Sequence, residues 1–288
     1  MKKILLTGAT GFVGGHFYHE YKSVYDIQPL SLRQTKIEDI SFAGVDSVVH
    51  CAALVHQMSG APENEYFKIN YELTKALALA AKASGVKQFI FLSTSHVYGT
   101  SGDLYNHDER LTENSPCDPK DSYGKSKLAA EKFLLSIEDA EFKVAIIRPP
   151  MVYGKGAKGN IVTLAKLIQH LPLLPLKFFK NKRSIVYVGN LCHVISLIVN
   201  LEASGIYLPQ DPRLVSTADL VRAIAKALGK KIYLFPLTPI GYAVLFKLAP
   251  KISTRLFGTL ALDNTLTKKR LGETTKFSTD DGIKIMFT

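Results

Sequence analysis

The middle of the chain holds two side chains with complementary proton chemistry. Tyr123 carries a phenol and Lys127 an ammonium group, with three residues between them, and on a helix this spacing places both side chains on one face. A phenol near its free pKa of about 10 is a poor base, but a neighbouring cation favours its charged form. The pair therefore predicts acid/base catalysis, in which Tyr123 takes a proton from a hydroxyl or gives one to a carbonyl oxygen. The same pattern also fits a surface tyrosine beside a solvated lysine.

A glycine-rich turn stands near the N-terminus, where residues 7–14 read T-G-A-T-G-F-V-G. It follows an apolar run of strand length and precedes a helical pattern, which is the context that a dinucleotide-binding turn requires. The first glycine allows a tight turn, the second lets the backbone approach a pyrophosphate at the helix N-terminus, and the third lets helix and strand pack closely. The loop residues predicted to contact a dinucleotide are Gly8, Thr10, Gly11, Phe12, Val13 and Gly14.

These motifs, together with the run S-T-S-H-V-Y-G at residues 93–99, resemble the extended short-chain dehydrogenase/reductase superfamily and, within it, the NAD-dependent epimerase/dehydratase family. The resemblance covers nearly the whole chain. It implies an NAD(P)-dependent enzyme in which Thr94 hydrogen-bonds the reacting oxygen beside Tyr123 and Lys127. The further cofactor contacts that the resemblance implies are Cys51, Ala52 and Ala53 of an H-x-A-A segment, Asn70, Ser93, Tyr123, Lys127 and Pro149.

The resemblance also implies a nucleotide-diphosphate sugar as the substrate. Arg183 matches an arginine that binds the diphosphate, a task that suits the bidentate guanidinium group, whereas Met151 stands where the family usually has an asparagine. Ser95 and His96 occupy the place of the Asp-Glu pair of the family's 4,6-dehydratases, which disfavours dehydration. The predicted substrate contacts are Ser95, His96, Met151, Asn160, Arg183 and Arg255.

The second predicted strand, residues 27–32, bears on the choice of cofactor. An acidic residue near its end would bind the ribose 2′-hydroxyl of NAD, but the chain there reads Ser31, Leu32, Arg33. Because Arg33 can bind a 2′-phosphate, the sequence slightly favours NADP(H) over NAD(H). The alternative is that Arg33 is only a solvated charge.

The whole pattern is most similar to a subgroup of bacterial UDP-glucose 4-epimerase-like proteins that serve surface-polysaccharide synthesis, which includes reductases of UDP-4-keto-6-deoxy-N-acetylhexosamines. The main prediction is therefore a 4-ketoreductase of a UDP-4-keto-6-deoxy-hexosamine, with hydride transfer at sugar C4 and Tyr123 as acid/base. One alternative is a UDP-hexose or UDP-N-acetylhexosamine 4-epimerase with tightly bound NAD. A second alternative is a catalytically silent, dinucleotide-binding regulator that has kept the fold.

Composition limits the remaining classes of protein. The 288 residues are 47% apolar and include only three cysteines, which are far apart, so neither a disulfide framework nor a zinc or other metal site is expected. The apolar run after Met1 is too short for an export signal or a membrane span, which predicts a cytoplasmic protein. The sequence has no motif typical of nucleic-acid binding.

Positive charge is concentrated in the C-terminal half. Residues 1–150 carry a net charge of −2 and residues 151–288 a net charge of +13, which suits nucleic acid, an anionic membrane or a polyanionic substrate. An apolar stretch at residues 239–250 is too short to cross a bilayer. We expect it to form a helix packed on its own lobe, and peripheral membrane contact through Lys247, Lys251 and Arg255 is the alternative.

Apolar runs of strand length alternate with helical patterns through the first half of the chain. This predicts an α/β fold, a Rossmann-type doubly wound parallel sheet with a smaller C-terminal substrate-binding lobe. Strands are expected at residues 3–6, 27–32, 47–50, 88–93, 143–148 and 184–188, and helices at 65–84, 122–136, 160–170 and 217–228.

The change in composition after about residue 150 predicts two domains. The dinucleotide-binding domain is expected at residues 1–153, with a return segment at about 184–203. The substrate-binding lobe is expected at residues 154–183 and 204–288. The family resemblance further implies a homodimer through the long helices that include Tyr123.

Overall fold

The computed structural model covers the chain and describes residues 1–288 except 56–60, 101, 105–107, 178–180, 237, 239–240, 242–246, 249–252 and 255–256; the side chain of Asn160 also lies outside the described part. None of the helices in that described part combines the length and the apolarity that a bilayer span requires.

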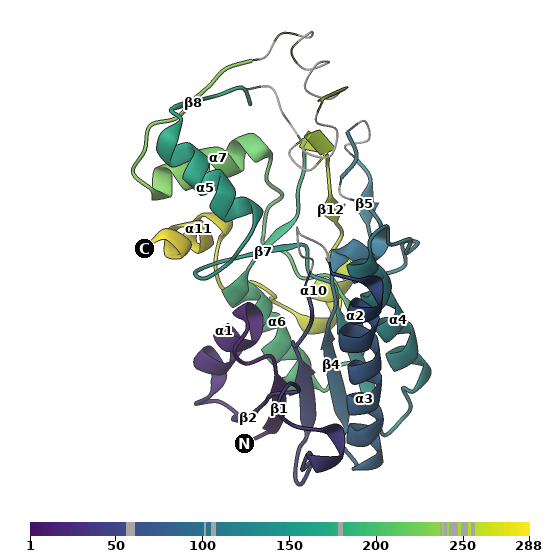
Figure 1. The fold of residues 1–288 in the computed structure, drawn as a ribbon. Helices are drawn as coiled ribbons and strands as arrows, with labels where there is room; N and C mark the ends of the chain where they lie inside the picture. Colours follow the sequence, from purple (N-terminus) through teal and green to yellow (C-terminus); the bar gives the residue numbers. More distant parts are fainter. Residues whose placement is uncertain are drawn as a thin grey trace.

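Six parallel strands form the central sheet, in the order β10, β6, β4, β3, β1, β2 (Figure 1). They are β1 (Lys3–Thr7), β2 (Asp26–Leu30), β3 (Ser47–His50), β4 (Gln88–Leu92), β6 (Lys143–Ile147) and β10 (Gly205–Tyr207). The inner strands are short apolar runs that are almost wholly buried, as expected for a parallel sheet covered on both faces. Thr7 pairs with Leu30 of β2 and with His50 of β3, so the carboxyl ends of these strands lie level.

Helices cover both faces of the sheet. The described α-helices are α1 (Phe12–Tyr21), α2 (Glu63–Phe67), α3 (Leu73–Ala83), α4 (Ser122–Ser136), α5 (Asn160–His170), α6 (Val188–Leu201), α7 (Thr217–Ala227), α10 (Thr265–Leu271) and α11 (Thr279–Phe287). Ile4 and Leu6 of β1 pack with Phe17 of α1 in one core, and α6 lies on the same side. Leu5 points to the opposite face and packs with Leu77 of α3 in a second core. This alternation is the period-two pattern of a strand.

Shorter elements complete the lobe and the loops. They are the single-turn helices η1 (Ile37–Asp39) and η3 (Ser95–Tyr98), the π-helical turn η2 (Lys68–Glu72), and the strands β5 (Arg110–Leu111), β7 (Met151–Tyr153), β8 (Leu173–Leu174), β9 (Ile185–Tyr187), β11 (Tyr233–Leu234) and β12 (Ala261–Leu262). β7 pairs with β9, β8 with β11, and β5 with β12, all in parallel.

The predicted α/β fold with a parallel central sheet is confirmed, and the differences are local. The helices expected at 122–136 and 160–170 have those bounds. The helix expected at 65–84 is instead α2, η2 and α3 in succession, and β2 ends at Leu30, two residues earlier than expected. β10 lies in the central sheet, so the segment that returns to this sheet continues past residue 203.

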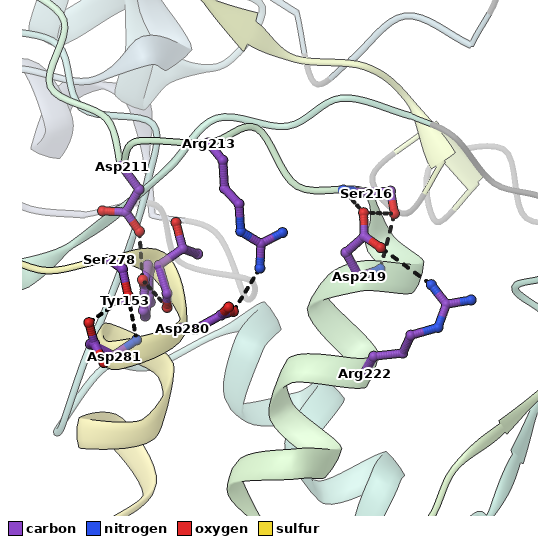
Figure 2. A network of polar contacts seen from close by, with 10 residues as sticks. Tyr153, Asp211, Arg213, Ser216, Asp219, Arg222, Ser278, Asp280 and Asp281 are labelled. Atoms are coloured by element: carbon purple, nitrogen blue, oxygen red, sulfur yellow. Dashed lines mark hydrogen bonds and ion pairs between the residues drawn. The ribbon is translucent and has the colours of Figure 1, made fainter.

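A buried carboxylate joins segments that are distant in the sequence. Asp211 Oδ1 accepts hydrogen bonds from the backbone N–H of Tyr187 and from Asn190 Nδ2, both at 2.9 Å, and its Oδ2 accepts from Tyr153 Oη at 2.6 Å. Tyr153 Oη also lies 3.1 Å from the carbonyl oxygen of Thr279. Figure 2 shows Tyr153 and Asp211 pointing toward each other beside the start of α11. These bonds fix the C-terminal helix against β7, β9 and α6.

Candidate active site

Helix α4 carries the predicted acid/base pair. Asp121 caps its N-terminus by accepting a hydrogen bond from the backbone N–H of Gly124 at 2.6 Å, which fixes where the helix begins. Tyr123 and Lys127 therefore lie about one turn apart on the same face. Lys127 is only 1% exposed, whereas Tyr123 is partly exposed.

Thr94 is the third residue of the predicted catalytic set. It precedes η3, where its hydroxyl accepts a hydrogen bond from the backbone N–H of His96 at 3.2 Å. Burial raises the pKa of Tyr123 to about 12, although the nearby side chain of Thr94 acts in the opposite direction. This corrects the expectation that Lys127 would favour the phenolate in the chain alone, because the desolvation of the phenol outweighs any favourable charge.

The charge state of Lys127 is set by its surroundings. Burial lowers the pKa of this lysine to about 7, against the attraction of the Glu131 carboxylate, which raises it. Lys127 Nζ lies 3.9 Å from the centre of the Phe91 ring, a cation–π contact that supports the charged form. Because Phe91 belongs to β4, the amine lies against the carboxyl half of this strand. Burial therefore favours the neutral amine of Lys127 more strongly than in a solvent-exposed lysine.

Asn70 connects α4 to the loop that follows β3. Its fully buried amide accepts a hydrogen bond from the Leu54 N–H at 2.8 Å, and donates to the Leu54 carbonyl at 3.0 Å and to Ser126 Oγ at 3.1 Å. Ser126 donates in turn to the carbonyl oxygen of Tyr123 at 2.8 Å. Asn70 lies in the π-helical turn η2, a local widening that is frequent at functional sites. The amide thus holds together the backbones of the loop and the active-site helix.

His50 is a site residue for which the sequence indicated no role. Its Nδ1 lies 2.6 Å from Thr7 Oγ1 and its Nε2 lies 2.9 Å from Thr74 Oγ1. Thr74 donates its hydroxyl hydrogen to the Asn70 carbonyl at 2.8 Å, so it accepts from the Nε2–H group of His50. Thr7 accepts from the Ala52 N–H at 3.2 Å and donates its own hydroxyl hydrogen to Nδ1. Burial lowers the pKa of His50 to about 3, and the neutral ring completes a directional chain from β1 to η2. The available sequence signal was a histidine at the end of an apolar strand.

A buried ion pair lies beneath α4. Arg148 and Glu131 are 4% and 1% exposed, and Arg148 Nη2 lies 2.7 Å from Glu131 Oε2. Arg148 also donates to Tyr98 Oη at 3.1 Å. The hydroxyl of Ser93, a predicted cofactor contact, donates to Glu131. Because a buried charge is stable only when it is paired and hydrogen-bonded, this network holds α4 against the ends of β4 and β6.

The glycine turn fits a dinucleotide. Gly8 has a φ of +73°, and a Cβ on Gly14 would lie 2.3 Å from the Gly8 carbonyl oxygen, so neither position tolerates a side chain. Gly11 is the N-cap of α1, and no described side chain caps this helix. The first N–H groups of the helix, at Phe12 and Val13, therefore face a place where an anion such as a pyrophosphate is favoured.

The other predicted cofactor contacts lie along the carboxyl edge of the sheet. Thr10 is exposed on the glycine turn, and Cys51, Ala52 and Ala53 are partly buried directly after β3. Burial raises the pKa of the Cys51 thiol to about 12, so Cys51 is not a thiolate nucleophile. Arg33 is exposed three residues after β2, at the same edge of the parallel sheet as the glycine turn.

Two predicted substrate contacts, Ser95 and His96, lie in the turn after β4. The backbone N–H of Ser95 donates to the carbonyl oxygen of Pro149 at 2.9 Å, which joins this turn to the loop after β6. His96 Nδ1 lies 3.1 Å from Asp121 Oδ2, and its ring packs edge-on against Tyr123 with 5.8 Å between ring centres. The structure therefore places His96, a predicted substrate contact, against the ring of Tyr123.

The structure describes only some of the predicted substrate residues of the lobe. Met151 begins β7 and is partly buried. Arg183 donates from Nη1 to the Gly258 carbonyl oxygen at 2.8 Å, and burial lowers its pKa to about 10. A guanidinium that is partly desolvated in this way is suited to an anionic partner. The side chain of Asn160 and the whole of Arg255 lie outside the described residues.

Comparisons with known proteins match this fold and site. The model of the NAD dependent epimerase/dehydratase family matches residues 4–207. The chain is 35% identical over 310 residues to the UDP-glucose 4-epimerase of Vibrio cholerae, covering 98% of this chain and 94% of that protein. It is 32% identical over 254 residues to the N-acetyl-alpha-D-glucosaminyl-diphospho-ditrans,octacis-undecaprenol 4-epimerase of Escherichia coli O157:H7, covering 80% of this chain and 73% of that protein. The fold matches the structure of UDP-glucuronic acid 4-epimerase from Bacillus cereus in complex with NAD with a TM-score of 0.74 at 20% identity, over 99% and 97% of the two chains.

Proposed function

The chain belongs to the NAD-dependent epimerase/dehydratase family, and we propose that its reaction is the 4-epimerisation of a UDP-hexose or UDP-N-acetylhexosamine. The observation that carries this proposal is the 35% identity with a UDP-glucose 4-epimerase over 98% of the chain, combined with a site in which Thr94, Tyr123 and Lys127 lie together. The sequence alone slightly favoured the 4-ketoreductase. The full-length similarity to a 4-epimerase reverses that order.

The proposed roles follow from the geometry of the three side chains. Tyr123 exchanges a proton with the oxygen on sugar C4, and Thr94, whose side chain lowers the pKa of the same phenol, orients that oxygen. Lys127 follows Tyr123 by about one helical turn, and its amine is buried with a lowered pKa. When bound in the glycine cradle, the nicotinamide dinucleotide supplies the acceptor and donor of hydride for C4. An epimerase oxidises and then reduces the same carbon, and Tyr123 can serve both steps because its phenolate accepts the proton of the C4 hydroxyl and its phenol returns that proton to the C4 oxygen.

Recognition of the substrate is proposed to centre on its diphosphate. The two related 4-epimerases act on sugars attached through a diphosphate to different groups, a nucleoside in one and a polyprenol in the other. Arg183 is a partly buried cation in the lobe, and a guanidinium binds phosphate oxygens in a bidentate manner. We therefore assign the diphosphate to Arg183, with His96 and Ser95 near the hexose.

The experiment that tests the proposal is incubation of purified protein with UDP-glucose or UDP-N-acetylglucosamine without added cofactor. The expected result is formation of the C4 epimer until the two sugars reach equilibrium. Tyr123→Phe should abolish this activity while the fold is retained. The matched variant Tyr71→Phe should keep it, since the ring of Tyr71 packs edge-on against Phe133. Bound cofactor without turnover on any nucleotide sugar would contradict the proposal and favour the silent regulator.

The 4-ketoreductase remains the second candidate because of Arg33. This exposed arginine after β2 suits the 2′-phosphate of NADP(H), the cofactor that a reductase exchanges in each turnover. Oxidation of NADPH that depends on a UDP-4-keto-6-deoxy sugar, and a loss of NADPH affinity but not NADH affinity in Arg33→Ala, would favour this reaction. Tight NAD that remains bound through purification would favour the epimerase.

We also propose that the protein forms a homodimer through the layer that contains α3 and α4. Leu79 on α3 and Leu135 on α4 are 44% and 37% exposed, and these two helices are in contact. Light scattering after size exclusion should give the mass of a dimer for the natural chain and of a monomer for Leu79→Arg. The control Leu201→Arg, at a 55% exposed leucine at the end of α6, should remain dimeric.

A further inference from the structure

The small sheet of the lobe exposes a row of apolar side chains. Leu173 of β8 and Tyr233 of β11 are 56% and 63% exposed, and Leu171 and Phe235 beside them are 46% and 42% exposed. We call these four residues the β8/β11 face. Monomeric proteins seldom expose contiguous apolar surface without a use for it.

The strand register explains why these four side chains share one face. Leu173 pairs with Tyr233, and Leu174 with Leu234, and directly paired residues of neighbouring strands point to the same side of a sheet. Leu174 is only 4% exposed and packs into the core, so the alternate positions point outward. Leu171 precedes Leu173 by two residues and Phe235 follows Tyr233 by two, so they continue the same outward row.

The segments that carry this face hold an unusual concentration of positive charge. Residues 154–201 and 220–262 contain 14 of the 20 lysines and arginines of the C-terminal half and none of its 7 aspartates and glutamates. Lys230 and Lys231 are exposed immediately before β11, and Lys177 is exposed after β8. The apolar row therefore has basic residues at both ends, and Figure 1 shows β8 at the end of the lobe that is remote from β1 and β2.

We propose that the β8/β11 face docks the protein on the surface of an anionic lipid bilayer. Apolar side chains flanked by lysines match such a surface, because they enter the interface while the lysines meet anionic headgroups. Nucleic acid would leave the apolar row without a partner, and a second copy of the same face would oppose like charges. Contact is peripheral, since no helix of the described residues can span a bilayer. The inference concerns a surface and does not rest on the proposed epimerase activity.

Docking on an anionic bilayer gives a role to positive charge of the C-terminal half that the proposed active site does not use. Arg183 is one of the 14 cations that the two segments around β8 and β11 carry, which leaves 13 that the proposed diphosphate contact does not use. The stretch 239–250, considered from the sequence for membrane contact, lies mostly outside the described residues. The proposal therefore stands on the β8/β11 face and its flanking lysines alone.

The test is co-sedimentation of the full chain with vesicles of phosphatidylcholine containing phosphatidylglycerol, compared with vesicles of phosphatidylcholine alone. We expect binding to the anionic vesicles that weakens as salt is raised. Each lysine near an anionic surface contributes roughly a factor of five to the partition coefficient, so Lys230→Gln combined with Lys231→Gln should lower it about 25-fold. The charge control is Lys22→Gln, an exposed lysine just after α1.

The apolar contribution has its own matched pair of variants. Leu173→Ser combined with Tyr233→Ser should lower the partition coefficient by at least about tenfold, because two partly buried apolar side chains are lost from the interface. Leu201→Ser removes a leucine of almost equal exposure, 55% against 56%, and should have no effect. A circular dichroism spectrum equal to that of the natural chain establishes that each variant is folded.

Three results would overturn the proposal. The first is that the natural chain does not sediment with anionic vesicles at low salt. The second is that it sediments equally with and without phosphatidylglycerol, and the third is that the β8/β11 variants bind as well as their controls. A lower molecular mass of the Leu173 and Tyr233 variant in solution, without any vesicle binding by the natural chain, would instead assign this face to self-association. Because binding is measured without turnover, these outcomes are independent of the enzyme assay.

Discussion

The burial of Lys127 should lower the free energy of unfolding, and this effect can be measured. Its pKa is lowered from 10.5 to about 7 by burial, so between these values the unfolded chain binds a proton that the native chain does not hold. Stability therefore rises with pH across this window, and the full penalty is present below about pH 7. A shift of this size corresponds to roughly 5 kcal/mol.

The perturbation is Lys127→Met, which keeps a long apolar side chain and removes the titrating amine. At pH 7 the variant should be more stable than the natural chain by up to about 4 kcal/mol, because most of the penalty is still present there. From pH 7 to pH 9 the stability advantage of the variant should shrink by about 2 kcal/mol. In this range the amine of the folded natural chain loses its proton, whereas the unfolded chain keeps it. The same variant should lose catalytic activity.

The assay is urea unfolding followed by far-ultraviolet circular dichroism at several pH values in this range. The matched control is Lys125→Met, because Lys125 lies on the same helix and is exposed. The window must stop near pH 9, since the pKa values of Cys51 and Tyr123 are raised to about 12, and such groups lower stability at higher pH. A stability difference between natural chain and variant that does not change with pH would refute the reasoning, as would a variant less stable at pH 7.

Three further changes test the framework of the site. Asn70→Ala removes the three hydrogen bonds of a buried amide and should lower the free energy of unfolding by about 3 kcal/mol, whereas Asn64→Ala, on an exposed residue of α2, should change it little. Gly14→Ala places a Cβ 2.3 Å from a backbone oxygen and should abolish cofactor binding, measured by fluorescence titration; normal affinity would contradict the cradle. Tyr153→Phe removes the 2.6 Å bond to Asp211 and should cost about 2 kcal/mol in urea unfolding, and an unchanged midpoint would contradict the role of this contact.

The sequence predicted the features that depend on local pattern. Short apolar runs between helical segments indicated the parallel sheet, and the spacing of Tyr123 and Lys127 indicated a shared helix face. The glycine turn was recognisable because its requirements, a tight turn and close approach of backbones, are met by one residue type at fixed spacing.

The unpredicted features depend on contacts between distant segments. His50 is linked to Thr7 and Thr74 across 43 and 24 residues, and nothing in their separate neighbourhoods indicates that they meet. The same holds for Asp211, whose partners come from β7, β9 and α6. The pKa of Tyr123 was misjudged because the charge of Lys127 can be read from the sequence, whereas the desolvation of the phenol cannot.

The most direct test of the central claim follows the hydride at sugar C4. UDP-glucose labelled with deuterium at C4 is incubated with the purified protein without added cofactor, and the product is analysed by mass spectrometry and NMR. The account predicts that the C4 epimer forms with the deuterium still on C4, and that Tyr123→Phe forms none. Absence of the epimer, together with NADPH oxidation that requires a 4-keto sugar, would contradict the epimerase assignment.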